Sequence, residues 1–230
     1  MWWFAALHAN VQMAYRRYAS QTPGARVLDA GCGTGGLLAR LDGAYDAVGI
    51  DADAAACARA VAKSGHPVCA GSIDALPFAD AAFSAIVSAD VLCHSGVDER
   101  HALAQFHRCL GAGGILVLNL PAYRWMMSRH DTAVYNVRRY TKRGVLALLR
   151  AAGFQPLFAS YWNMLLFPLM VLTRKLLPGG GSDVRGQPGW VEAVGRAATG
   201  IERVLIRTGI ALPFGGSVLA VAAKIESSHA

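Results

Sequence analysis

The residues with the clearest chemical potential surround a run of glycines near the N-terminus. Residues 27–41 read VLDAGCGTGGLLARL, an apolar run typical of a buried strand, then a break at glycine, then a helical pattern. Glycine permits a tight turn and a close approach of the backbone to a ligand, and a helix that begins there directs its N-terminal amides toward that ligand. The stretch therefore predicts a nucleotide site but leaves the nucleotide open.

Two acidic residues narrow the choice of nucleotide. The GxGxxG spacing of Gly31, Gly33 and Gly36 is shared with dinucleotide enzymes. Asp29, however, would repel a pyrophosphate by about 1–4 kcal/mol at about 4 Å, and it suits a cationic group such as the ammonium of an amino acid. Asp51 ends the next expected strand, about 20 residues after the turn, where an acid can hydrogen-bond ribose hydroxyls.

These motifs resemble those of a known enzyme family. DAGCGTG (29–35) resembles the motif that opens class I S-adenosylmethionine (SAM) methyltransferases. Residues 71–92 resemble the segment in which that family holds adenine, with Ser72 in place of the usual acid, and residues 110–122 resemble its LxPGGxxxxxxP segment, with Ala112 in place of the proline. The resemblance covers nearly the whole chain and implies SAM as the cofactor. It implies these cofactor-binding residues: Asp29, Gly31, Gly33, Gly35, Asp51, Ala52, Ser72, Ile73 and Asp90.

Candidate catalytic residues follow the fifth expected strand, in SRHDTAVYNVRRYT (128–141). In the functional interpretation His130 is a general base, and Arg138 and Arg139 form a cationic clamp for an acidic or phosphorylated acceptor. The alternative is a solvated helix end in which His130 is hydrogen-bonded and has no catalytic role. Tyr140 is a further catalytic candidate, and His94 matches a frequent histidine of the family near the methyl donor, as a catalytic group or as part of the pocket wall.

A narrower resemblance covers roughly residues 121–175. This segment resembles a bacterial subgroup whose members often appear alongside lipid- or polysaccharide-modifying enzymes, although Asn136 stands where the subgroup commonly has histidine. The hypothesis that follows is methyl transfer to an oxygen of a small, largely apolar or lipid-like acceptor, with Trp3 among the substrate-binding residues.

Composition and charge limit the class of protein. The chain has 230 residues, 54% of them hydrophobic, which is sufficient for one domain spanning residues 1–230. The net charge of +7 indicates an acidic partner or serves solubility alone. The five cysteines form no CxxC pair, so we expect reduced thiols, a cytoplasmic location and no metal site.

Apolar runs that suit strands alternate with helical patterns along the chain. This alternation predicts an α/β fold with a doubly wound, mostly parallel sheet covered by helices on both faces. The resemblance implies a seven-stranded, Rossmann-like sheet whose last strand is inserted antiparallel. After the first strand, the expected strands span residues 45–50, 67–70, 85–88, 115–123, 155–161 and 217–224.

Two segments stand apart from this alternation. Residues 1–22 contain an expected helix whose Trp2, Trp3 and Phe4 pack on the domain, form a lid over the site, or touch a membrane surface. Residues 162–213 form an insertion before the last strand. The apolar run 157–172 is shorter than the ~20 residues that span a bilayer, so it predicts a helix packed on the domain, a homodimer contact, or peripheral contact at the inner face of the membrane.

Three other functions share parts of these patterns. A nicotinamide-dependent dehydrogenase would have the same sheet, but Asp29 opposes a pyrophosphate and no Tyr-x-x-x-Lys pair follows. A nucleic-acid or amine methyltransferase would account for the positive charge. However, strand 85–88 is not followed by an NPPY-type loop, and basic and aromatic residues do not alternate along a stripe, so we do not expect nucleic acid as a partner. The third alternative is a non-catalytic module that binds SAM or associates with membranes.

Overall fold

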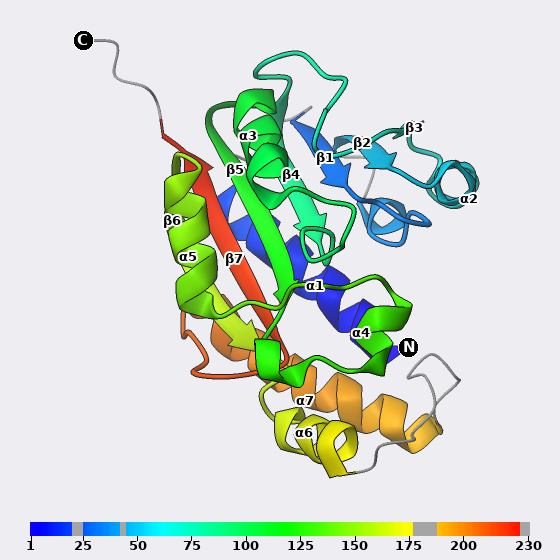
Figure 1. Cartoon of the computed structure of the whole chain (residues 1–230), viewed down its shortest axis with the longest axis vertical. Coiled ribbons are helices and arrows are strands. Elements are labelled where there is room, and N and C mark those ends of the chain that lie inside the picture. The colour runs from blue at the N-terminus through cyan, green and yellow to red at the C-terminus, as the bar shows by residue number, and fades with distance from the viewer. Residues whose placement is uncertain (20–24, 42–44, 177–187, 226–230) are drawn as a thin grey trace.

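Seven strands form one sheet in the order β3-β2-β1-β4-β5-β7-β6 (Figure 1). The computed structural model describes residues 1–19, 25–41, 45–176 and 188–225. Strand β7 runs antiparallel to both of its neighbours, and the other strands are parallel to one another. The predicted seven-stranded, mostly parallel sheet is confirmed. The strands are β1 (Arg26–Ala30), β2 (Asp46–Asp51), β3 (Val68–Ala70), β4 (Phe83–Ala89), β5 (Leu110–Pro121), β6 (Phe154–Trp162) and β7 (Ser217–Lys224).

Helices connect the strands, and several begin at a side chain that caps them. The Asp53 carboxylate accepts hydrogen bonds from the amides of Ala55 and Ala56, and the Thr141 hydroxyl accepts one from the amide of Gly144. The α-helices are α1 (Trp2–Tyr18), α2 (Ala54–Ser64), α3 (Glu99–Cys109), α4 (Arg129–Ala133), α5 (Lys142–Ala151), α6 (Phe167–Leu176) and α7 (Gly189–Arg207). Two 3-10 helices are η1 (Leu38–Arg40) and η2 (Arg124–Met126).

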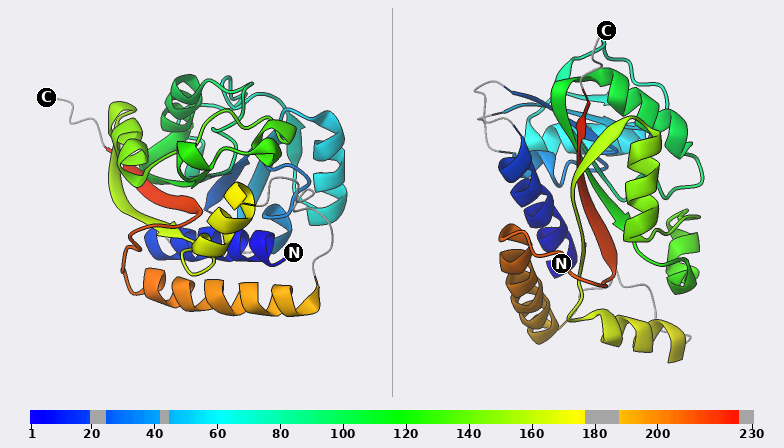
Figure 2. Two further views of the ribbon diagram at one scale, coloured as in Figure 1. Left: turned by 60° about the horizontal axis from the view of Figure 1, so that its bottom comes forward. Right: turned by 90° about the vertical axis from the view of Figure 1, so that its left-hand side faces the viewer.

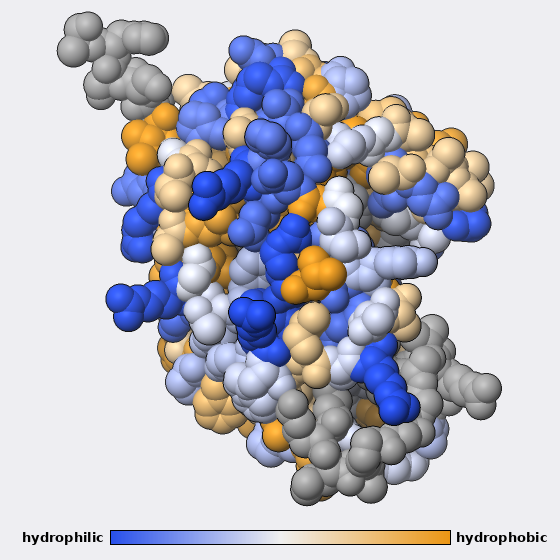
Figure 3. Space-filling view, viewed as in Figure 1, coloured by the Kyte–Doolittle hydropathy of each residue, from blue (hydrophilic) through white to orange (hydrophobic). Residues whose placement is uncertain are grey.

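The helices cover both faces of the sheet. Helices α3 and α5 pack on one face, and α1 and α2 pack on the other, each group closing a separate apolar core. Helix α7 lies against the outer side of α1 as a further layer (Figure 2), where the absence of a side chain at Gly195 leaves room for the ring of Trp2. Over α3 the surface is mostly hydrophilic, with apolar side chains in small separate patches (Figure 3).

Two local expectations differ from the structure. The chain after the glycine turn forms consecutive turns and η1 instead of a regular α-helix, because Gly33 and Gly35 have left-handed φ values of +52° and +73°. The apolar run 157–172 is not one helix: its first part belongs to β6, and Asn163, with φ +59°, redirects the chain before α6. In the described part of the chain, no helix is long and apolar enough to cross a membrane.

Candidate active site

The candidate site lies where the strand order reverses. The chain moves outward from β1 to β2 and β3 on one side, and β4 and β5 lie on the other side. Doubly wound sheets bind ligands in the crevice at the carboxyl ends of the strands at such a point. Asp29 is on β1, Asp51 ends β2, and Asp90 directly follows β4, so the fold brings all three predicted acidic residues to this crevice.

The glycine turn has no room for side chains on its inner side. Gly31 has φ +85°, and a Cβ there would collide with the side chain of Val91. At Gly35, a Cβ would lie 2.8 Å from the Cα of Ala60. At Gly33 a Cβ would meet no atom within 4 Å, so this part of the turn faces open space. The backbone is thus exposed to a ligand at Gly33 and packed on its other side.

Two carboxylates flank this turn in different ways. The Asp51 carboxylate accepts hydrogen bonds from the amides of Gly33 (2.8 Å) and Asp53 (3.0 Å), which fix its orientation. Asp29 is only 3% exposed, and its Oδ2 has no hydrogen-bond partner. Burial, and then the neighbouring charge of Asp51, raise the pKa of the Asp29 carboxyl to about 7. A buried acid that lacks a partner fits a cationic group, such as the ammonium group of the predicted cofactor.

The residues expected near the adenine lie at the same edge of the sheet, after β2 and β3. Ala52 and Ser72 are exposed, and Ile73 is buried in the core. The Ser72 hydroxyl accepts a hydrogen bond from the amide of Asp74 (3.1 Å) and so stabilises a local turn. The Asp74 carboxylate accepts one from the amide of Asp98 (3.1 Å). The roles of Ala52, Ser72 and Ile73 toward adenine stay predictions.

Asp90 is held by a series of contacts that starts at the N-terminal helix. Its backbone is left-handed, with φ +57°, and its Oδ1 accepts a hydrogen bond from the amide nitrogen of Asn119 (2.9 Å). The Asn119 Oδ1 in turn accepts a hydrogen bond from the indole of buried Trp162 (2.7 Å). The Trp162 ring stacks on Trp3, with ring centroids 4.5 Å apart. Burial raises the pKa of the Asp90 carboxyl to about 7, against the opposing effects of Asn119 and Arg139.

A cavity of about 700 Å³ extends from Asp90 and His94 toward the helices. The beginning of α1, the helix α6 and the beginning of α7 supply most of its apolar wall, and Trp3 is part of it. Polar side chains reach it from the sheet edge and from the connection between β5 and α5. The structure thus brings the N-terminal helix and the insertion together over one space.

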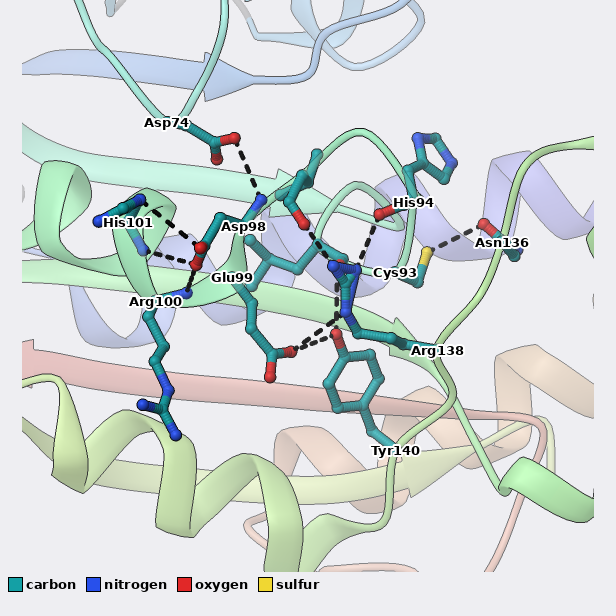
Figure 4. A network of polar contacts seen from close by, with 12 residues as sticks. Asp74, Cys93, His94, Asp98, Glu99, Arg100, His101, Asn136, Arg138 and Tyr140 are labelled. Atoms are coloured by element: carbon teal, nitrogen blue, oxygen red, sulfur yellow. Dashed lines mark hydrogen bonds and ion pairs between the residues drawn. The ribbon is translucent and has the colours of Figure 1, made fainter.

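His94 and Asn136 face each other across the cavity edge as partners in an isolated β-bridge. Burial lowers the pKa of His94 below its ordinary value, against the opposing charge of Asp51, so the imidazole is neutral at neutral pH. Asn136 accepts a hydrogen bond from the Cys93 thiol (3.1 Å). Figure 4 shows the His94 ring directed away from the polar network beneath it.

Arg139 lies at the cavity in a buried ion pair. Its guanidinium contacts the Asp131 carboxylate at 2.8 and 2.9 Å, and the two side chains are 4% and 0% exposed. Burial acts to raise the pKa of Asp131, but the Arg139 charge and the Ser128 donors hold it below the ordinary value. Because Asp131 neutralises it, Arg139 presents hydrogen-bond donors with little net charge, in contrast to the predicted cationic clamp.

Arg138 and Tyr140 do not line this cavity. The Arg138 guanidinium donates hydrogen bonds to the carbonyl groups of Leu92, His94 and Val97. The Tyr140 hydroxyl donates to the Glu99 carboxylate (2.8 Å) and lies 3.0 Å from the Leu92 carbonyl oxygen. Both side chains point toward Glu99 (Figure 4). The structure therefore places both side chains in contact with the loop after β4 and away from the cavity, and the substrate and catalytic roles expected for them stay predictions.

His130 belongs to the short helix α4, and its side chain lies outside what the structure describes. Its neighbour Asp131 forms an ion pair with Arg139 and accepts a hydrogen bond from the Ser128 hydroxyl. In the described ranges, no group of three or more His, Cys, Asp or Glu side chains could hold a metal ion.

Three residues that sequence reasoning did not single out belong to the site. Asn119 links Trp162 to Asp90, and it is the one polar residue in the apolar run ILVLNLP (115–121), a signal that could have revealed it. Asn163 lines the cavity at 2% exposure, and its Oδ1 has no partner. No local sequence pattern indicates the positions of Trp162 and Asn163.

Comparisons with known proteins agree with this geometry. A family model of the methyltransferase domain matches residues 28–118. A probable S-adenosylmethionine-dependent methyltransferase from Mycolicibacterium smegmatis is 29% identical over 63% of the chain and 57% of that protein. The O-methyltransferase cnsE from Penicillium expansum is 38% identical over 43% of the chain and 39% of that protein. The chain thus spans less than two thirds of the length of these relatives.

Solved structures share the fold across nearly the whole chain. The geranyl diphosphate C-methyltransferase from Streptomyces coelicolor aligns over 94% of the chain and 78% of that protein, with a TM-score of 0.62 and 16% identity. The glycine turn, the positions of Asp29 and Asp51 and the mostly parallel, seven-stranded sheet match the expectation from the sequence. The methyltransferase-domain match over residues 28–118 and these relatives support a class I SAM-dependent methyltransferase.

Proposed function

We propose that this protein transfers a methyl group from SAM to an oxygen atom of a small, largely apolar acceptor. The observation that carries the proposal is the cavity of about 700 Å³ that joins the crevice at Asp90 and His94 to an apolar wall made by three helices. Ligand sites of this kind are mostly apolar, with a few polar groups that fix the orientation of the ligand.

The residues of the crevice fit SAM. Asp29 offers an unpartnered buried carboxyl to the ammonium group, and the open side of Gly33 beside Asp51 suits the ribose. When bound, SAM supplies a methyl group on a sulfonium, which is already activated by its charge. The chain therefore has chiefly to align the acceptor oxygen and to remove its proton.

Four described groups at the cavity could accept this proton, but Asp131 is paired with Arg139, and Glu192 lies near the Met1 amino group and Arg196. Asp90 and His94 are therefore the proposed acceptors. The raised pKa of Asp90, about 7, makes its carboxylate a stronger base than an ordinary aspartate, and the lowered pKa of His94 keeps its imidazole neutral. The proton would leave the acceptor hydroxyl for one of these groups as the oxygen bonds to the methyl carbon. The bond between the methyl carbon and sulfur would break as the oxygen–carbon bond forms, and its electron pair would stay on sulfur. The products would be a methyl ether or ester and the neutral thioether S-adenosylhomocysteine.

The known proteins support the acceptor class without defining it. One relative is an O-methyltransferase, and one structural neighbour is a C-methyltransferase bound to geranyl diphosphate. The apolar wall that Trp3, Leu166 and Met170 contribute here favours an acceptor with a hydrocarbon portion. Arg139 and Asn163 would contact its polar portion by hydrogen bonds.

A transfer assay with labelled SAM and a panel of apolar alcohols, phenols, carboxylic acids and amines tests the proposal. We expect transfer to an oxygen, with kcat at saturating SAM rising with pH through about 7 as Asp90 ionises. Asp90→Asn should lower kcat by about 100- to 10,000-fold and remove this pH dependence if Asp90 is the base. If His94 is the base, His94→Ala should lower kcat by a similar factor, and the rise of the wild-type kcat should lie below pH 6.5. His101→Ala, an exposed histidine on α3, is the matched control.

Two results would contradict the proposal. Transfer to amines alone would exclude an oxygen acceptor, and equal activity on strongly polar and apolar acceptors would exclude selection by the apolar wall. Unchanged kcat in both variants would show that alignment suffices and that the acceptor enters ionised.

A further inference from the structure

The rim of the cavity is apolar and exposed to solvent. Met1, Phe4, Leu169, Trp190 and Val194 all line the cavity, yet each is exposed, Trp190 to 71%. Large apolar side chains that rim an opening in this way mark an interaction surface, because scattered apolar residues on a soluble surface do not gather around one cavity.

Further apolar side chains extend this rim along two helices. On α7, Trp190, Val194, Ile201 and Val204 are exposed and fall within about a quarter of the helix circumference at 3.6 residues per turn. Leu165, Leu169 and Leu172, in and just before α6, repeat at the four- and three-residue spacing of one helix face. We call these residues together with Phe4 the rim surface.

The charges around the rim surface favour an anionic partner. Residues 163–216 contain six basic and three acidic residues in sequence, and the basic side chains that the structure describes are Arg196, Arg203 and Arg207. Glu192 lies 3.8 Å from the amino group of Met1 and 3.5 Å from Arg196, and Glu202 is buried, where it accepts a hydrogen bond from the amide of Leu165. The third acid, Asp183, lies outside the described residues. The acidic side chains that the structure describes are thus engaged within the protein.

The arginines of α7 lie to one side of the apolar stripe. Arg196, Arg203 and Arg207 repeat at the seven- and four-residue spacing that places them on a common flank, about 100° or more around the helix from the centre of the stripe. An amphipathic helix that lies in the plane of a membrane has this arrangement, with apolar side chains in the acyl region and basic ones at the headgroups.

We propose that the rim surface docks on an anionic lipid bilayer, so that the acceptor enters the cavity directly from the lipid. The second part rests on the proposed methyl transfer to an apolar acceptor, whereas the docking itself does not. A second copy of the chain or another protein on this surface would cover the mouth of the cavity and obstruct entry. A lipid surface covers the same apolar side chains and also supplies an apolar acceptor.

Vesicle flotation with the full chain tests the docking. We expect binding to vesicles of phosphatidylglycerol and phosphatidylcholine, weaker binding to phosphatidylcholine alone, and partial release by high salt. Leu172→Asp combined with Ile201→Asp should weaken binding by about tenfold or more, because neither acid can enter the acyl region. Arg207→Gln should weaken it about fivefold at low salt. Val61→Asp, an exposed apolar position on α2, is the matched control and should bind as the wild type does.

Leu172 and Ile201 do not line the cavity, so the double variant separates docking from catalysis. It should methylate a dispersed short-chain acceptor at the wild-type rate and lose activity only toward an acceptor embedded in vesicles. Failure of the wild type to bind anionic vesicles, or equal losses in the control and the double variant, would overturn the docking. So would sedimentation showing a dimer that the double variant dissociates. Absence of transfer to every acceptor, with vesicle binding intact, would instead overturn the proposed function.

Discussion

When it is ionised, the buried carboxyl of Asp29 makes the ligand-free protein less stable. Asp29 is 3% exposed and its Oδ2 has no partner. Its pKa is raised from 3.8 to about 7, first by burial and then by the charge of Asp51. Since one pKa unit corresponds to about 1.4 kcal/mol, the ionised carboxylate costs about 4 kcal/mol of folding free energy at pH 8.

The sign of the pH dependence follows from the direction of the shift. Below pH 3.8 the carboxyl is protonated in both the folded and the unfolded state and has no effect. As the pH rises from there to about 7, the unfolded chain loses its proton first, so the free energy of unfolding falls. The Asp29→Asn variant never carries this charge. It should therefore be about 4 kcal/mol more stable than the wild type at pH 8, and less than 2 kcal/mol more stable at about pH 5.

Urea unfolding of the ligand-free protein and the variant at pH 5 and pH 8 measures this difference. Taking the variant minus the wild type at each pH cancels the contributions of other acids such as Asp90. The difference should grow by about 2.5 kcal/mol between the two values. Asp51→Asn offers a second comparison, because loss of its charge should lower the pKa of Asp29 and reduce the effect.

Asp29→Asn should also weaken the binding of SAM, since it removes the partner of the ammonium group. Asp29→Arg should abolish SAM binding. Calorimetry at pH 6 should show the wild type releasing close to one proton per SAM bound, because the carboxyl is mostly protonated beforehand, and the variant releasing almost none. A variant no more stable than the wild type at pH 8, or one that binds SAM equally well, would refute the reasoning.

Three further substitutions test the contacts around the cavity. Tyr140→Phe should lower the free energy of unfolding by about 1.5–3 kcal/mol through loss of its bond to a carboxylate, with kcat little changed; a large fall in kcat would support a catalytic role. Asp131→Asn should lower the free energy of unfolding by about 3–5 kcal/mol, measured with denaturant, because Arg139 is left buried without a counter-charge. A smaller loss would mean that water reaches the ion pair. Gly195→Val should displace Trp2 and lower kcat/KM for the acceptor without changing the Kd of SAM, and unchanged kcat/KM would contradict that packing.

The cofactor half of the site was readable from the sequence because it is built from short-range signals. Parallel strands are buried on both faces, so each appears as an apolar run, and the acid that ends the run marks the edge of the sheet. Gly31 and Asp29 lie two residues apart on one strand and its turn, and Asp51 follows on the neighbouring strand. Their relative positions therefore require only the assumption that β1 and β2 are adjacent and parallel.

The segment after β5 was not readable in the same way. Residues 138–140 lie outside the helices, and Tyr140 pairs with Ala122 in a β-bridge. In strand-like backbone successive side chains point to opposite sides. Arg138 and Tyr140 consequently share the side that faces Glu99, and Arg139 points to Asp131 and the cavity. A sequence that places two arginines side by side predicts one basic site, whereas the alternation of the backbone separates them.

The acceptor half of the site depends on segments that are distant in the chain. The cavity wall combines residues 1–4 with parts of α6 and α7, and the helices of the insertion lie between two strands whose pairing is independent of them. Asn119 connects the two halves, because it bonds Asp90 on one side and Trp162, under Trp3, on the other. Changes in α6 or α7 would therefore reshape the proposed acceptor cavity while the sheet and its crevice stay the same, whereas a change at Asn119 would affect both halves.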